Sequence, residues 1–261
     1  MKTAPDYPKG RALLEGKTVL VTAAAGTGIG FSVAKRCAEE GAKALVISDI
    51  HERRLAEAAE AIAKDTGLTP TTVLCNVTKE EDVQRLFASA IEAMGHVDVF
   101  MNNAGLGGHA RIMEMTDEQW GAVLDVSLNG CFRSVRAAMR HMVPRGAGAI
   151  VNNASVLGWR AQEGQAHYAA AKAGVMALTR CAAIEAAETS SVRINCVAPT
   201  LAKHPFLAKV TPPGLLEQLE AKEAFGRGAE PWEIANVMIF LASDLSSYMT
   251  GEVLSVSSQH A

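Results

Sequence analysis

The sequence has few cysteines, and their arrangement is uninformative for disulfides. The five cysteines are odd in number, scattered, and never in a CxxC spacing: Cys37, Cys75, Cys131, Cys181 and Cys196. Such a set does not indicate a disulfide framework. We expect reduced, mostly buried thiols that pack as small hydrophobic side chains in a cytoplasmic protein.

The chain also lacks a strong excess of charge of either sign. It has 25 Lys and Arg against 28 Asp and Glu, which gives a formal net charge of -3 with neutral histidines. A nucleic-acid-binding protein usually shows a basic excess or stripe. The near balance therefore argues against nucleic acid as a partner.

Long apolar runs are absent. The segment Met1–Lys17 carries charged residues and two prolines, and it has no apolar core of a signal peptide. The best candidate for a membrane span is interrupted by Lys172, Arg180 and Glu185, so no run approaches the roughly 18 residues required. We expect a soluble cytoplasmic protein with no membrane partner.

The length of the chain favours one domain. It has 261 residues, of which 49% are hydrophobic, and α/β folds of about 250 residues occur as single units. A chain of this length buries most of the surface of its unfolded form, so no metal or disulfide is needed to stabilise it. We expect one domain over residues 1–261, with an N-terminal extension at 1–13.

Short β-branched runs alternate with longer helical patterns along the chain. The predicted strands are Thr18–Thr22, Ala44–Ser48, Thr72–Cys75, Val97–Asn102, Ala149–Asn153, Val192–Val197 and Val253–Val256. The predicted helices lie near 29–40, 51–65, 79–94, 116–142, 165–188 and 231–243. This order predicts right-handed crossovers and an α/β Rossmann-type fold, a doubly wound, seven-stranded parallel sheet with helices on both faces.

Residues 199–226 break this alternation with four prolines and a glycine: Pro199, Pro205, Pro212, Pro213 and Gly214. Ligands of such sheets bind at the carboxyl ends of the strands. An insertion after the strand Val192–Val197 could therefore lie over the site as a lid. A surface connection with a short amphipathic helix is the alternative.

A glycine-rich turn follows the first predicted strand. It reads Ala23-Ala24-Ala25-Gly26-Thr27-Gly28-Ile29-Gly30 and opens a helix, whose N-terminal N–H groups favour a pyrophosphate. Asp49 ends the second strand, where a carboxylate would accept hydrogen bonds from the ribose hydroxyls of a dinucleotide. A helix N-cap is the alternative role for Asp49, less plausible beside this loop.

Three further residues form a candidate catalytic set. Tyr168 and Lys172 are four positions apart in a predicted helix, so their side chains share one face. An ammonium stabilises a neighbouring phenolate, as a phenolic acid/base requires. Ser155 follows the strand Ala149–Asn153, where its hydroxyl could hold a substrate oxygen.

With these residues in place, the sequence resembles the classical short-chain dehydrogenase/reductase family from Leu14 to Val256. The matching motifs are the glycine loop, Asn102-Asn103-Ala104-Gly105, Ser155, Tyr168-Ala-Ala-Ala-Lys172, Arg193-Ile194-Asn195 before Pro199, Gly226-Arg227, Glu230-Pro231, Phe240-Leu241-Ala242-Ser243-Asp244 and Thr250-Gly251-Glu252. The resemblance implies that Ser155 orients the substrate, that Tyr168 is the acid/base, and that Lys172 binds the nicotinamide ribose. It implies NAD as cofactor, contacted by Gly26, Thr27, Gly28, Ile29, Asp49, Asn76, Val77, Asn103, Ala104, Gly105, Tyr168, Lys172 and Pro199.

The sequence departs from the family pattern at several places. Alanines stand where the first glycine of the loop is expected, and the loop has one residue more than usual. Ser127 replaces the asparagine of the catalytic tetrad, with a hydroxyl that could still hold a relay water. Asn76 replaces an aspartate whose acceptor role its amide oxygen could keep. Pro199-Thr200 with His204 and the tail Ser257-Ser258-Gln259 replace the usual residues near the nicotinamide and at the C-terminus.

The resemblance also implies a substrate. The glycine loop and residues 199–207 look like those of actinobacterial short-chain dehydrogenases of steroid ring C/D breakdown, which act on bicyclic hydroxy-indanone thioesters of coenzyme A. Trp159, His204 and Phe206 could then contact the substrate, and the cations Lys203, Lys209, Lys222, Arg111 and Arg160 could meet its phosphates. The alternatives are a 3-oxoacyl thioester reductase or 3-hydroxyacyl dehydrogenase, a free secondary-alcohol dehydrogenase, or a catalytically silent NAD-binding protein. The family commonly forms homotetramers through two long helices, here near 116–142 and 165–188.

Overall fold

The computed structural model describes residues 3–203 and 214–258. It contains a seven-stranded sheet in the order β3-β2-β1-β4-β5-β6-β7, with every neighbouring pair parallel. The strands are β1 (Thr18–Thr22), β2 (Ala44–Asp49), β3 (Thr71–Leu74), β4 (Val99–Asn102), β5 (Ala149–Asn153), β6 (Arg193–Pro199) and β7 (Val253–Val256). The predicted doubly wound parallel sheet is confirmed, with strand bounds that differ by at most two residues.

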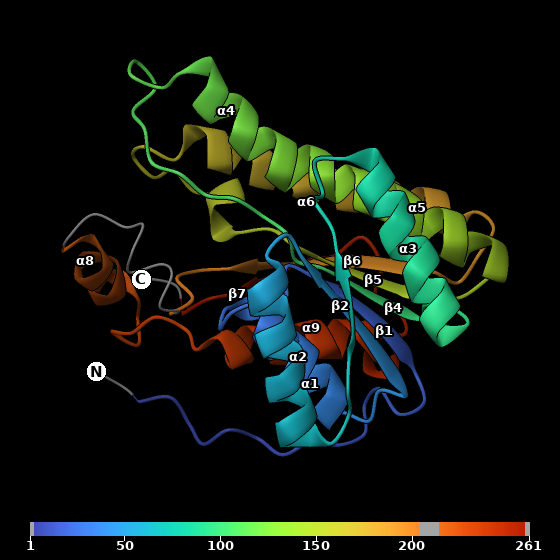
Figure 1. The fold of residues 1–261 in the computed structure, drawn as a ribbon. Coiled ribbons are helices and arrows are strands. Elements are labelled where there is room, and N and C mark those ends of the chain that lie inside the picture. Colours follow the sequence, from blue (N-terminus) through green and yellow to red (C-terminus); the bar gives the residue numbers. More distant parts are fainter. Residues whose placement is uncertain (1–2, 204–213, 259–261) are drawn as a thin grey trace.

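Helices cover both faces of this sheet (Figure 1). One face packs against α1 (Ile29–Glu39), α2 (Glu52–Thr66) and α9 (Pro231–Ala242). The other packs against α3 (Glu80–Met94), α5 (Gly130–Met142) and α6 (Ala166–Ala187), while α4 (Asp117–Leu124) continues the line of α5. Because both faces are covered, the central strands β1 and β4 are buried along their whole length, which explains their unbroken apolar runs.

The helix predicted over 116–142 is not continuous. A π-helical turn, Asp125–Asn129, separates α4 from α5. A π turn adds one residue to the helix and shifts the direction of the side chains in it. Within this turn Ser127 is buried, and its hydroxyl exchanges two hydrogen bonds of 2.9 Å with the backbone of Leu106.

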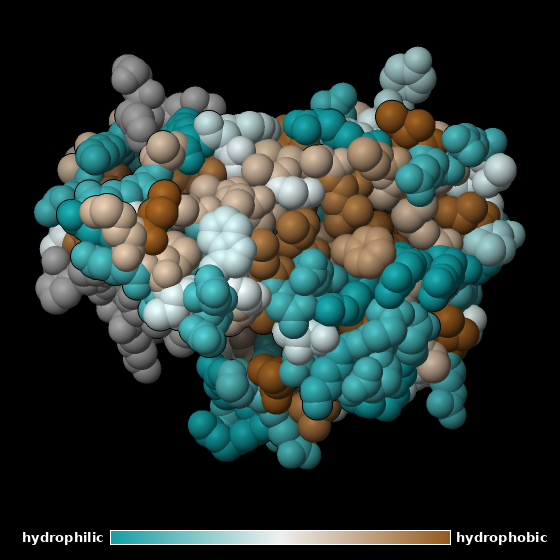
Figure 2. All heavy atoms as spheres, turned by 90° about the horizontal axis from the view of Figure 1, so that it is seen from above, coloured by the Kyte–Doolittle hydropathy of each residue, from teal (hydrophilic) through white to brown (hydrophobic). Residues whose placement is uncertain are grey.

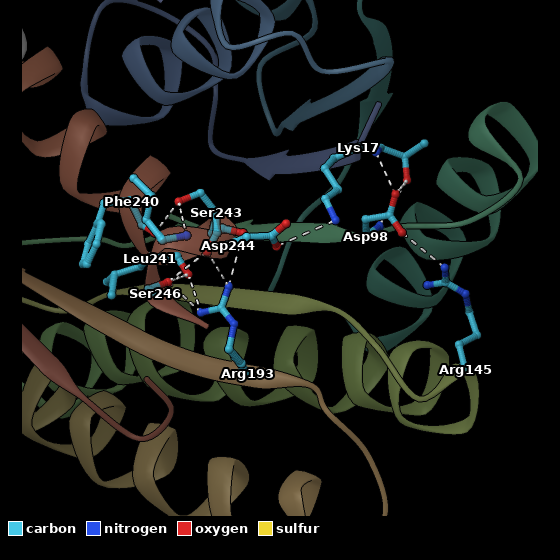
Figure 3. A network of polar contacts seen from close by, with 12 residues as sticks. Lys17, Asp98, Arg145, Arg193, Phe240, Leu241, Ser243, Asp244 and Ser246 are labelled. Carbon is cyan, nitrogen blue, oxygen red and sulfur yellow. Dashed lines mark hydrogen bonds and ion pairs between the residues drawn. The ribbon is translucent and has the colours of Figure 1, made fainter. Parts of the chain in front are cut away.

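Charged side chains fix the amino ends of the strands, as Figure 3 shows. Arg193, the first residue of β6, donates to the carbonyl oxygens of Leu241 and Ser243 at the end of α9, at 2.8 and 3.0 Å. A cation there satisfies carbonyls that the helix leaves unpaired. Asp98, just before β4, accepts hydrogen bonds from the backbone N–H and the hydroxyl of Thr18, both at 3.0 Å. The amino ends are thus occupied by structural contacts, and the carboxyl ends remain for a ligand.

The segment before β1 is hydrogen-bonded to a buried ion pair at the end of α1. Arg36 and Glu40 lie 2.6 Å apart, and their side chains are only 6% and 0% exposed. Glu40 also accepts from the backbone N–H groups of Arg11 and Leu13, while Arg36 donates to the carbonyl oxygen of Pro8. These hydrogen bonds compensate for the burial of the two charges.

The helix α8 (Leu215–Lys222) lies in the predicted insertion 199–226. Residues 204–213 fall outside the described part of the chain, and they include the predicted substrate contacts His204 and Phe206. The prediction of a lid is therefore not tested at these residues. Among the described residues, no helix combines the length and the hydropathy needed to cross a membrane.

Candidate active site

Lys172 lies at the centre of the predicted catalytic set. Its side chain is buried, and Nζ donates a hydrogen bond of 2.7 Å to the carbonyl oxygen of Asn153, the last residue of β5. The same ammonium lies 5.5 Å from the centre of the Tyr168 ring, one helical turn earlier on α6. The predicted pairing of the phenol with a cation is therefore present in the fold.

Ser155 lies beside this helix. It precedes a 3-10 turn, Val156–Gly158, and its Oγ accepts a hydrogen bond of 3.2 Å from Leu157 N. The turn packs directly on α6, since a Cβ atom at Gly158 would lie 3.0 Å from the backbone nitrogen of Ala173. Strand β5 and helix α6 thus bring Ser155 to the same end of the sheet as Lys172.

Gly105 makes room for the ammonium. A Cβ atom there would lie 3.2 Å from Lys172 Nζ and 3.6 Å from Ser127 Oγ. Ser127 therefore lies next to the Lys172 ammonium. Its hydroxyl is engaged with both backbone groups of Leu106, so in this structure it holds the loop after β4 in place.

The glycine loop presents an open backbone at the start of α1. Gly26 has φ +86, a left-handed conformation, and a Cβ atom at Gly26 or Gly28 would meet nothing within 4 Å. At Gly30, by contrast, a Cβ atom would lie 2.0 Å from Ala23 O, so this position needs glycine for close packing of α1 on β1. An accessible helix N-terminus bordered by such a turn fits a pyrophosphate.

Asp49 ends β2 beside this loop. Its Oδ2 accepts a hydrogen bond of 3.1 Å from Ala25 N, and its Oδ1 accepts one of 3.0 Å from His51 N. The N-cap position of α2 is occupied by His51, so Asp49 is not that cap. A carboxylate offers about four lone-pair directions. The two in use hold Asp49 in place, and the others suit the hydroxyls of a ribose.

Asn76 and Val77 continue the predicted adenine side. The Asn76 amide oxygen accepts from the N–H and the hydroxyl of Thr78, at 3.1 and 2.9 Å, in a tight turn. Val77 is buried, and a Cβ atom at Gly130 would lie 2.8 Å from its side chain. From the sequence we expect the Asn76 amide oxygen to accept a hydrogen bond from the cofactor. In the structure this oxygen already accepts two hydrogen bonds within the turn.

Asn103 connects the end of β4 to the glycine loop. Its Nδ2 donates to the carbonyl oxygens of Thr22 and Ala23, at 3.3 and 3.2 Å. The backbone N–H groups of Asn103 and Ala104 donate to the Thr22 hydroxyl. Pro199 ends β6, in register with Val256 of β7. These residues lie along the edge formed by the carboxyl ends of the strands.

The two asparagines at the end of β5 make different contacts. Asn152 bonds Asn102 and Thr179 in the core at 2.9 Å each. The carbonyl oxygen of Asn153 holds Lys172, and its side chain donates to Asn103 Oδ1 at 2.8 Å; this residue is not among the site residues predicted from the sequence. The alternation of side chains along a strand, together with the position two residues before Ser155, is the signal that could have distinguished them.

The predicted substrate residues are only partly described. Trp159 is 50% exposed next to the Ser155 turn, while His204 and Phe206 lie outside the described residues, as does Lys209. Two of the cations expected to meet phosphates are paired with carboxylates. Arg111 forms an ion pair with Glu163, and Lys203 lies 2.9 Å from Glu220. Acidic neighbours from other segments therefore already pair with two of the cations that the sequence assigns to the phosphates.

In the described part of the chain, no three His, Cys, Asp or Glu side chains gather as a metal site would require. The site is therefore built from hydroxyl, amide, carboxylate and ammonium groups and from open backbone.

Several known proteins are similar to this chain in sequence. Residues 23–258 match the family model described as enoyl-(acyl carrier protein) reductase. Over 263 aligned residues the chain is 58% identical to (5R,7aS)-5-hydroxy-7a-methyl-1-oxo-2,3,5,6,7,7a-hexahydro-1H-indene-carboxyl-CoA reductase of Mycobacterium tuberculosis, covering 100% of this chain and 99% of that protein.

Solved structures are similar as well. A short chain dehydrogenase from Mycobacterium smegmatis has a TM-score of 0.87 and 54% sequence identity, with 99% of each chain covered. An NAD+-bound xylitol dehydrogenase has a TM-score of 0.87 and 31% identity, over 94% of this chain and 99% of that one.

The glycine loop generates a stability prediction at Ala23. This residue has φ 52, a left-handed conformation that costs a residue with a Cβ atom about 1 kcal/mol or more. We expect Ala23→Gly to raise the free energy of unfolding by about 1 kcal/mol, measured by urea denaturation. Ala24→Gly is the control. Ala24 is buried and outside the left-handed region, so this change should lower stability by about 1 kcal/mol. Equal losses in both variants would contradict the left-handed conformation of Ala23.

Proposed function

Because the chain belongs to the short-chain dehydrogenase/reductase family, and is therefore a nicotinamide-dependent oxidoreductase, we propose that it transfers a hydride between NAD(H) and a secondary alcohol or ketone on a bicyclic acyl-coenzyme A thioester. The observation that carries this proposal is the 58% identity, over the whole chain, to a hydroxy-methyl-oxo-indene-carboxyl-CoA reductase. The presence of Ser155, Tyr168 and Lys172 on one end of the sheet supports catalysis over a silent binding role.

The nicotinamide cofactor, when bound, supplies or accepts the hydride. The chain supplies the proton and the alignment. Ser155 Oγ accepts from Leu157 N, which leaves its O–H to donate to a substrate oxygen. Tyr168 exchanges the proton with that oxygen. Lys172 uses one of its three N–H donors on Asn153 O, so the other two serve the ribose and the phenolic oxygen.

A homotetramer and a cytoplasmic location belong to the same proposal. Trp120 of α4, Phe132 of α5 and Ile184 of α6 are 41%, 44% and 69% exposed, and Figure 2 shows apolar side chains gathered on this face. Exposed apolar groups of this size favour association with another copy. Four of the five free cysteines are buried, which is consistent with a reducing compartment.

The proton-transfer role predicts the behaviour of Tyr168→Phe. The ring keeps its packing beside Lys172, but the transferable proton is lost. We expect kcat to fall by roughly 10³-fold or more, while the Kd of NADH, measured by fluorescence titration, changes by less than about twofold. Tyr248→Phe is the control, because Tyr248 is fully exposed and away from the site. Near-normal turnover by Tyr168→Phe would refute the acid/base assignment.

Asp49 predicts a preference for NAD(H) over NADP(H). A 2′-phosphate would lie against its carboxylate, and like charges repel. The next residue, Ile50, carries no charge, and Arg53 is 82% exposed and paired with Glu57. We expect kcat/KM at least tenfold higher with NADH than with NADPH, and a ratio near one in Asp49→Ala.

The control for this measurement is Glu52→Ala, which removes an exposed carboxylate at the start of α2. It should leave the ratio unchanged. Comparable efficiency of the unchanged protein with both cofactors would contradict the role of Asp49.

The substrate is tested by comparing three alcohols. These are a bicyclic hydroxy-indanone thioester of coenzyme A, its free acid, and a linear 3-hydroxyacyl thioester. We expect kcat/KM for the bicyclic thioester to exceed the values for the other two alcohols by tenfold or more. Turnover is measured by the absorbance of the NADH that forms. Equal turnover of the free acid would remove the thioester from the proposal. A preference for the linear thioester would favour a general 3-hydroxyacyl dehydrogenase, and no turnover with intact NADH binding would favour a silent protein.

A further inference from the structure

Asn153 ends β5 at the junction of the glycine loop and the catalytic helix. The preceding residue, Asn152, points into the core beneath α5 and α6, where it contacts Thr179. Since successive side chains of a strand point to opposite faces, Asn153 points to the other face, on which α1 begins. Its partner in register on β6 is Val197, a core residue of that face.

Hydrogen bonds fix the orientation of the Asn153 amide. Asn103 Nδ2 donates to two carbonyl oxygens, those of Thr22 and Ala23, so the group that Asn103 turns toward Asn153 must be its Oδ1. An acceptor there requires a donor opposite, which is Asn153 Nδ2 at 2.8 Å. The oxygen of Asn153 must consequently face away from Asn103.

This oxygen is buried and has no hydrogen-bond partner. Buried amide oxygens in folded proteins are nearly always satisfied, and an exception calls for a physical reason. The backbone of the same residue holds the ammonium of Lys172, and the catalytic hydroxyl of Ser155 follows two residues later. A ligand bound at the catalytic end of the site would therefore lie next to Asn153 Oδ1, an acceptor that lacks a donor.

We propose that Asn153 is a cofactor-positioning residue, whose Oδ1 accepts a hydrogen bond from the nicotinamide half of the dinucleotide. The inference rests on the proposed use of a nicotinamide cofactor and assigns a residue to its recognition. The donors available on that half are the carboxamide NH2 and the ribose hydroxyls. Because Asn153 Nδ2 is held by Asn103, which is itself tied to the glycine loop, the acceptor is oriented before the cofactor binds.

The test is a set of dissociation constants measured by isothermal titration calorimetry. Asn153→Leu removes the amide while keeping the volume. We expect it to weaken NAD+ binding about tenfold, equivalent to about 1.4 kcal/mol. ADP, which lacks both the nicotinamide ring and its ribose, should bind to the variant within about twofold of its affinity for the unchanged protein. Asn153→Ala, which adds no branched side chain, should give the same pattern if Asn153→Leu does not fold.

Asn236→Leu is the matched control. Asn236 also has a buried Oδ1 without a partner, but it lies on α9. Its substitution should leave both ligands unaffected. The 3-acetylpyridine analogue of NAD+ has no carboxamide N–H. A tenfold weaker affinity of the unchanged protein for this analogue assigns the carboxamide as donor, and an unchanged affinity assigns a ribose hydroxyl.

An equal loss for NAD+ and ADP would overturn the inference, because Asn153 would then act only through Asn103 and the glycine loop. Unchanged affinity for NAD+ in both Asn153 variants would overturn it as well. If the unchanged protein binds neither NAD+ nor NADH, the proposed function is refuted, and the inference falls with it. The other two outcomes overturn the inference alone, because in them the unchanged protein still binds the cofactor.

Discussion

The hydrogen bond from Lys172 Nζ to the carbonyl oxygen of Asn153 is the interaction on which the site depends. Lys172 is only 3% exposed, and a buried ammonium is tolerated only when it is well bonded. The bond of 2.7 Å fixes α6 against the end of β5. Since Tyr168 lies one turn before Lys172 and Ser155 lies two residues after Asn153, this single contact determines where both hydroxyls lie.

The same strand end connects the proposed catalytic residues to the glycine loop. The side chain of Asn153 bonds Asn103, and Asn103 bonds the carbonyl oxygens at the start of the glycine loop. The loop, the end of β4, the end of β5 and the Lys172 ammonium are therefore joined in one chain of hydrogen bonds. At the opposite end of the sheet, Arg193 and Asp98 hold the strands through purely structural contacts. The parallel sheet thus separates these structural contacts from the end of the sheet that carries the proposed site.

The sequence predicts what depends on local pattern and on strand order. The apolar runs predict the strands, the glycines predict the phosphate loop, and the spacing of Tyr168 and Lys172 predicts a shared helix face. Contacts between distant segments are not predictable in this way. The π turn at Asp125–Asn129 adds one residue that a periodic pattern does not register. The pairing of Arg111 with Glu163 and the orientation of the Asn153 amide depend on where separate loops and strands meet.

Isotope tracing distinguishes direct hydride transfer to a substrate carbon from every route that passes through solvent. The purified protein is incubated with the bicyclic ketone thioester and NADH that carries deuterium at both C4 positions, and the alcohol is analysed by mass spectrometry. Direct transfer predicts an alcohol that is one mass unit heavier than the product of unlabelled NADH, with the deuterium on the carbinol carbon. An alcohol without deuterium, or no alcohol at all, would contradict it.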